Sequence, residues 1–296
     1  MDKNKLIGVF LLGMVAIAAK ADIVQTELAD LTVGTVGIET ENAASIWGEN
    51  PNADEVIRQI NECATVSFND KEREILRYIL MADVSGIKSL EKRSEDYLNA
   101  RLNTLMAQGL FRDAITLLDK VPGSKQTNAL KQKRAEALFA EGFVKAACEE
   151  NLIGSFGSEE AFVRAICADS VGVPPASALA YEVYRESGAD THPFLNASGE
   201  ILYRDLAPDL PEGVPSVWEA PIVAKVYGAE IFKRPLSREV LSALSNNETV
   251  PYGIRMKAKN LLNRPLQNEK ADGHILDYLS AGAKLRSQMP NFIGTE

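Results

Sequence analysis

The spacing of glycines constrains the fold of this chain more than any other feature. The segments Ala107–Ala114 and Ala140–Ala147 share one pattern, in which alanine precedes a glycine, a bulky pair follows it, and alanine returns. Their glycines, Gly109 and Gly142, lie about 33 residues apart, and Gly172 follows at a similar interval. A repeat of this length is typical of stacked helical hairpins, because a single hairpin cannot bury its apolar face alone. The sequence therefore predicts an all-α fold, a right-handed α-solenoid of antiparallel helical hairpins.

The N-terminus has the features of a secretory signal peptide. Lys3 and Lys5 precede the uncharged apolar run Leu6–Ala19, which is followed by small residues at the two positions that signal peptidase reads. The run of about 14 residues is shorter than the roughly 20 needed to span a bilayer. We expect cleavage after Ala21, so that residues 1–21 are a signal peptide and the mature chain is periplasmic or secreted, with no integral membrane segment. An uncleaved anchor is the alternative.

Charge excludes several classes of partner. The whole chain carries a formal net charge of −9, and loss of residues 1–21 removes three lysines and one aspartate, which makes the mature chain more acidic still. Nucleic-acid binding depends on clustered basic residues, whereas here both signs alternate, as in Lys71–Glu74 and Glu91–Glu95. Mixed runs of this kind are typical of solvated helix faces. We therefore expect no nucleic-acid partner and no docking on anionic lipid.

Cysteine usage fits an oxidising compartment. Cys148 and Cys167 flank a short break at residues 151–157, so a disulfide between them would join two consecutive helices. The alternative is that both are small buried apolar residues. Cys63 is left over as a buried, reactive or intermolecular cysteine, and burial is the favoured interpretation. The two histidines, His192 and His274, are far apart, so we expect no metal site and no cofactor.

The chain divides into three parts. Residues 1–21 form the signal peptide, residues 22–48 a flexible N-terminal arm without helical periodicity, and residues 49–290 a helical-repeat domain with a possible joint at 192–215, where prolines accumulate. Asn69 and Glu72 form a capping box at the start of the second helix. Hairpins are predicted to turn at Gly109, Gly142 and Gly172. Further helices are expected near 89–108, 111–120, 125–141, 143–150, 216–230, 237–246, 249–263 and 271–287.

A family resemblance extends over most of the mature chain. The chain is similar to the second half of a tetratricopeptide repeat at six positions, which are Gly109, Phe111, Ala114, Ile115, Leu118 and Val121. The first half matches poorly, with Leu98, Leu102 and Leu105 but no aromatic signature. Together with Ile46-Trp47-Gly48, the Leu118–Pro122 hairpin end and the two spaced cysteines, the chain resembles secreted alphaproteobacterial helical-repeat, tetratricopeptide-like proteins. The resemblance implies the fold and the compartment, and little about function.

Enzyme motifs fail on their context. Ser85–Lys88 and Ser89–Lys92 both fit the S-x-x-K pattern of serine acylases, but the accompanying K-T-G motif is absent and those enzymes need a strand platform. Glu186, followed by serine near a helix end, resembles the catalytic glutamate of soluble lytic transglycosylases, although their downstream Gly-Leu-Met-Gln motif is missing. A general-acid glutamate also requires a desolvated cleft. We therefore expect a protein without enzymatic activity.

Stacked hairpins present their first helices along an extended groove that can hold a peptide or helix. Candidate lining residues are Arg101, Asn103, Gln108, Lys131 and Arg134, with a solvated surface as the alternative for each. The hypothesis is a non-enzymatic periplasmic scaffold or adaptor that binds an envelope protein or peptide. The competing class is a cell-wall enzyme or a module that binds peptidoglycan.

Overall fold

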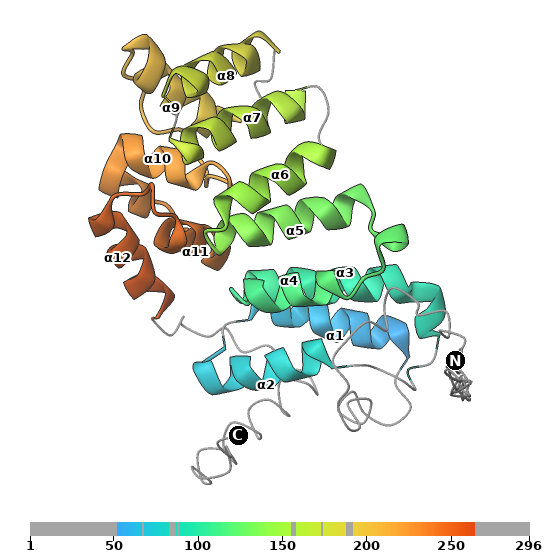
Figure 1. Cartoon of the computed structure of the whole chain (residues 1–296). Coiled ribbons are helices and arrows are strands. Elements are labelled where there is room, and N and C mark those ends of the chain that lie inside the picture. Colours follow the sequence, from blue (N-terminus) through green and yellow to red (C-terminus); the bar gives the residue numbers. More distant parts are fainter. Residues whose placement is uncertain are drawn as a thin grey trace, which may run out of the picture. The chain divides into compact units, whose positions relative to one another are not determined.

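The described part of the chain is built from helices. The computed structural model describes residues 52–66, 68–82, 87, 89–154, 158–172, 174–187 and 192–263. Over these ranges the chain forms α-helices and short 3₁₀ helices and no β-strand, which confirms the all-α prediction (Figure 1). The predicted signal peptide, the N-terminal arm and the helix expected at 271–287 lie outside the described residues.

The first eight α-helices follow one another as α1 (Ala53–Thr65), α2 (Asp70–Met81), α3 (Ser94–Ala107), α4 (Phe111–Asp119), α5 (Asn128–Ala140), α6 (Val144–Gly154), α7 (Ser158–Val171) and α8 (Pro174–Glu186). They are followed by α9 (Pro193–Arg204), α10 (Ala220–Tyr227), α11 (Arg238–Asn246) and α12 (Tyr252–Leu262). The 3₁₀ helices are η3 (Leu90–Arg93), η4 (Gly123–Lys125) and η5 (Gly228–Lys233).

The three glycines end helices as predicted. Gly109, Gly142 and Gly172 adopt φ values of 75°, 84° and 79°, a left-handed conformation that glycine reaches without steric cost. They separate α3 from α4, α5 from α6, and α7 from α8. Consecutive helices from α3 to α9 pack against each other in chain order (Figure 1). The helices on either side of each of these glycines therefore pack together.

Helix starts follow capping chemistry. Asn52 caps α1 by accepting a hydrogen bond from the Glu55 amide, and Asn69 with Glu72 forms the predicted capping box of α2. Two predicted helices begin later than expected because a 3₁₀ turn precedes each of them. Residues 90–93 form η3 before α3, and the Thr127 hydroxyl caps α5 after η4.

Two C-terminal helices, α10 and α11, pack against helices from earlier in the chain. Helix α11 packs against α3 and α5, and α10 packs against α7, in addition to their neighbours in sequence (Figure 1). Asn246 at the end of α11 donates a side-chain hydrogen bond to the Ala140 carbonyl oxygen at 3.0 Å. Lys225 of α10 forms an ion pair of 2.6 Å with Asp169 of α7, in which both side chains are largely buried. Simple repeat arrays contact only their neighbours, so these long-range contacts are an addition that the glycine period did not predict.

The proline-rich stretch at 192–215 contains α9 and then an irregular segment that is held by hydrogen bonds. The Tyr227 hydroxyl donates to the Pro208 carbonyl oxygen, and the Arg234 guanidinium donates to the carbonyl oxygens of Leu210 and Pro211. The buried Glu219 carboxylate accepts from the Leu195 amide at the start of α9. The segment is thus anchored to the helices that follow it.

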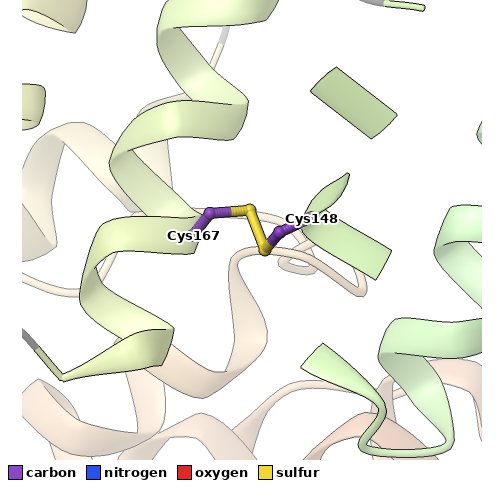
Figure 2. The surroundings of a disulfide bond; sticks show 2 residues. All are labelled: Cys148 and Cys167. Atoms are coloured by element: carbon purple, nitrogen blue, oxygen red, sulfur yellow. A yellow bond between two sulfur atoms is a disulfide. The ribbon is translucent and has the colours of Figure 1, made fainter. Parts of the chain in front are cut away.

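A disulfide joins α6 to α7. Cys148 and Cys167 are bonded, with Cα atoms 5.8 Å apart, which confirms the pairing expected from the sequence (Figure 2). Such a link between consecutive hairpins stabilises the fold mainly by restricting the unfolded chain. Cys63 is a free, buried thiol, as favoured above, and burial raises its pKa to about 12. None of the described helices is both long and apolar enough to cross a membrane.

Candidate functional site

Two of the five predicted groove residues lie in the core. Arg101 of α3 is fully buried and donates to the carbonyl oxygens of Leu80 and Ala82 at the end of α2. Gln108, just after α3, is 3% exposed and its side-chain amide donates to the carbonyl oxygens of Cys63 and Val66. The interpretation of these two side chains as lining an exposed groove is therefore corrected. They satisfy carbonyl groups that helices leave unpaired at their C-terminal ends.

The other three predicted residues lie at the surface of α3 and α5. Asn103 is exposed and accepts a hydrogen bond from Lys133. Lys131 is partly exposed. Arg134 forms ion pairs with Asp119 at 3.0 Å and with Glu150 at 2.9 Å, and so links α5 to α4 and α6. These residues remain accessible, but Arg134 is already engaged within the fold.

A cavity of about 180 Å³ lies where four helix ends meet. The C-terminal ends of α1, α3 and α12 and the N-terminal end of α11 surround it. Its wall is formed by Ala64, Thr65, Val66, Ala107, Gln108, Leu236, Ser237, Arg238, Leu241, Leu261 and Leu262. Most of these side chains are apolar, and the exposed Thr65 and Ser237 mark its opening to solvent.

Two of these residues each have one buried polar atom without a hydrogen-bond partner. The Gln108 side-chain oxygen is buried without a donor, although the nitrogen of the same amide is fully used. The Nε of Arg238 is buried without an acceptor, while its Nη1 donates to the Leu262 carbonyl oxygen at 3.3 Å. Among the described residues, no carboxylate forms an ion pair with Arg238. Burial, with a smaller contribution from the nearby Arg73, lowers the pKa of its guanidinium, and the charge of Asp70 opposes this shift.

Helix α8 carries an exposed apolar pair. Leu179 is 68% exposed and Val183 is 48% exposed, and they lie one turn apart on the same face. Tyr181 and Tyr184 of the same helix are buried, and the Tyr181 hydroxyl donates to the Asn196 carbonyl oxygen of α9. The helix therefore buries one apolar face and exposes another.

The enzyme-like motifs do not assemble into a site in the described residues. Glu186 is exposed at the C-terminal end of α8, so no desolvated cleft surrounds its carboxylate. Ser85 and Lys88 lie outside the described residues, and Ser89 is exposed. In the part of the chain that the structure describes, no group of three or more His, Cys, Asp or Glu side chains could hold a metal ion.

Comparisons of the chain with protein-family models, with curated proteins and with solved structures find no match. The functional interpretation therefore depends on the surface features of the described residues, above all the exposed pair on α8. Sequence reasoning missed the cavity because Arg238 opens a short helix about 130 positions after Gln108. Only the packing of α11 against α3 brings the two together.

Proposed function

We propose that the mature protein is a non-enzymatic, extracytoplasmic helical-repeat scaffold that binds an amphipathic helix of an envelope protein on the outer face of α8. The observation that supports this proposal is the exposed apolar pair Leu179 and Val183. Two large apolar side chains one turn apart form the kind of stripe that packs against a partner helix. A solvent-facing helix surface normally carries polar residues, so an exposed apolar pair on α8 needs another explanation.

The proposal includes the compartment and the architecture. Export through a signal peptide cleaved after Ala21 is compatible with the disulfide between Cys148 and Cys167, since such bonds persist in oxidising compartments. A solenoid of tetratricopeptide-like hairpins, related to secreted alphaproteobacterial repeat proteins, agrees with the three glycine turns. In this architecture the partner surface lies on an outer helix face, because α3, α5 and α7 are each contacted by α10 or α11.

Site-specific photo-crosslinking in the native host tests the proposal. A photoreactive residue at position 179 or 183 should give one dominant protein adduct by mass spectrometry. The same probe at Lys120, an exposed position at the end of α4, is the matched control and should not. The double variant Leu179→Ser, Val183→Ser should no longer co-purify with the protein that the photoreactive probe identifies. Its circular dichroism spectrum should still show the helical content of the wild type. The absence of a specific protein adduct at either position would refute the α8 surface.

The cell-wall alternative is decided in the same experiment. Adducts that contain only peptidoglycan fragments would favour the glycan-binding class. In that case Glu186→Gln should abolish muropeptide release if the protein is a lytic enzyme, and should leave glycan binding intact if it is a binding module.

A further inference from the structure

We infer that the exposed face of α12 is a docking site for the stretch of the same chain that precedes α1, residues 32–51, and that opposite charge holds the two together. This inference does not depend on the protein partner proposed for α8. It concerns a different surface and an occupant that belongs to the chain itself.

The exposed face of α12 combines apolar and basic side chains. Tyr252 is 69% exposed and Met256 is 38% exposed. Arg255 and Lys259 lie beside them, because residues three, four and seven positions apart share one side of a helix. These four residues form the α12 face. It resembles the exposed pair on α8 in its apolar part but differs from it by carrying two cations.

Helix α12 covers the core with its other side. Ile254 and Ala258 are buried there, and the helix packs against α11 (Figure 1). The α12 face therefore points away from the layer on which the helix rests. A solvent-facing helix surface is normally polar throughout, so a large aromatic side chain that is mostly exposed at this position indicates that the face has an occupant.

The charge of α12 is not balanced within the fold. The helix contains three basic residues and no acidic one, although the whole chain has a formal net charge of −9. In the part of the chain that the structure describes, no carboxylate forms an ion pair with Arg255, Lys257 or Lys259. Lys257 instead lies over the Phe232 ring of η5, with its Nζ 4.4 Å from the ring centroid. Charge complementarity therefore favours an acidic, partly apolar occupant.

The chain contains a segment of this chemistry just before its first described helix. Residues 32–51 include Glu39, Glu41 and Glu49 but no Lys or Arg, and they also include apolar residues such as Ile38 and Trp47. The chain that follows α12, residues 264–296, carries four basic and four acidic residues. Its charges cancel, so electrostatic attraction selects the segment at 32–51.

The segment is long enough to reach α12. It ends next to Asn52, which caps the start of α1. The C-terminal ends of α1 and α12 line one cavity, so a path from the start of α1 to the start of α12 needs only the two helix lengths, about 20 Å and about 16 Å, and roughly 10 Å between packed elements. Residues 32–51 in an extended conformation span about 65 Å. A tethered segment also has an effective concentration on the order of 1 mM, so a few weak contacts are enough to hold it.

Photo-crosslinking within the purified full chain tests the inference. A photoreactive phenylalanine analogue replaces Tyr252 or Met256, and peptide mapping by mass spectrometry identifies the residues that it contacts. Both probes should form crosslinks to peptides from residues 32–51. The same probe at Leu202, an apolar position on α9 that is 42% exposed, is the matched control and should not.

Removal of the acidic charges distinguishes docking from the mere proximity of a tethered segment. A variant in which glutamine replaces all three glutamates of residues 32–51 should form these crosslinks at least about fivefold less, because three exposed charge pairs are lost. Its control loses three exposed carboxylates elsewhere and should crosslink like the wild type. The control substitutions are Glu91→Gln, Glu95→Gln and Glu149→Gln.

Reversal of one charge on α12 tests the other side of the contact. Lys259→Glu should also weaken the crosslinks, whereas Lys120→Glu, at an exposed position at the end of α4, should not. An equal mixture of ¹⁵N-labelled and unlabelled chains should give crosslinks within one chain only. Crosslinks that do not respond to these charge changes, crosslinks to residues 264–296 in place of 32–51, or isotopically mixed crosslinks between two copies would each overturn the inference.

Discussion

Arg101 shows how a polar side chain can be a core residue of a helical protein. It is fully buried, and its guanidinium donates to the carbonyl oxygens of Leu80 at 2.5 Å and Ala82 at 3.2 Å, beside the Tyr97 ring. Because Arg101→Met would leave buried carbonyl groups unpaired, we expect it to lower the free energy of unfolding by about 3 kcal/mol. Urea denaturation measures this change.

Arg112→Met is the control for that substitution. The Arg112 side chain is 80% exposed and forms a surface ion pair with Glu141, so its loss should leave the free energy of unfolding almost unchanged. Equal effects of the two substitutions would mean that the Arg101 hydrogen bonds do not contribute to stability.

Sequence patterns could not separate core from groove on α3. Tyr97, Leu98, Ala100, Leu102, Leu105 and Met106 are all buried, so this helix is covered on most sides. An amphipathic pattern identifies a polar residue as exposed only when one face is free. Arg101 and Gln108 are polar residues two helical turns apart, so their spacing alone does not distinguish a groove face from the core. Thr104, which lies between them at helical spacing, likewise donates to the Ile60 carbonyl oxygen inside the core.

At the scale of elements, Gly142 has a second role that the repeat pattern does not reveal. A Cβ atom at this position would lie 2.6 Å from the Asn246 carbonyl oxygen, because the end of α11 packs on the turn between α5 and α6. At Gly172, with nearly the same φ, a Cβ atom would meet nothing within 4 Å. Gly172→Ala should therefore cost only the left-handed strain of about 1–2 kcal/mol.

We expect Gly142→Ala to destabilise the protein by at least about 1 kcal/mol more than Gly172→Ala, since overpacking adds to the strain. Thermal or urea denaturation of the two variants side by side measures the difference. Equal losses would show that α11 does not approach this turn closely. The glycine period predicted the turn, but the close approach involves residues about 100 positions apart and leaves no local pattern.

The contact between α5 and α11 also makes stability depend on pH. Burial, together with the charge of Glu239, raises the pKa of Glu136 on α5, and burial raises the pKa of Glu239 on α11. Lys133 opposes both shifts, as does the Ser237 hydrogen bond at Glu239. A raised pKa means that the folded state holds the proton more tightly than the unfolded chain. The resulting stability is present below about pH 4.5 and is lost as pH rises through the raised pKa.

Glu136→Gln should therefore stabilise the protein at pH 7 and give little gain at pH 4, where the wild-type side chain is already neutral. Urea denaturation at the two pH values measures the difference between variant and wild type. Glu149→Gln, which removes an exposed carboxylate on α6, controls for the loss of one negative charge. A gain from Glu136→Gln that is the same at both pH values would contradict burial of the charged carboxylate.

At the scale of the whole described region, the long-range contacts of α10 and α11 change how the protein should unfold. In a simple repeat array each unit contacts only its neighbours, so terminal units open first and independently. Here Asn246 is bonded to the end of α5, Lys225 is paired with Asp169 of α7, and Trp218 lies 4.3 Å from the Phe139 ring, centroid to centroid. These contacts connect helices that are distant in sequence.

We therefore expect α3, α5 and α11 to open as one cooperative unit. Hydrogen exchange followed by mass spectrometry should give these three helices the same free energy of opening, because exposing α11 removes the buried contacts of Val240, Leu241 and Leu244 with the rest of the core. Gly142→Ala should lower protection in α5 and α11 together. Early exchange of α11, with α3 and α5 still protected, would show instead that α11 opens separately and that α3 and α5 are stable without it.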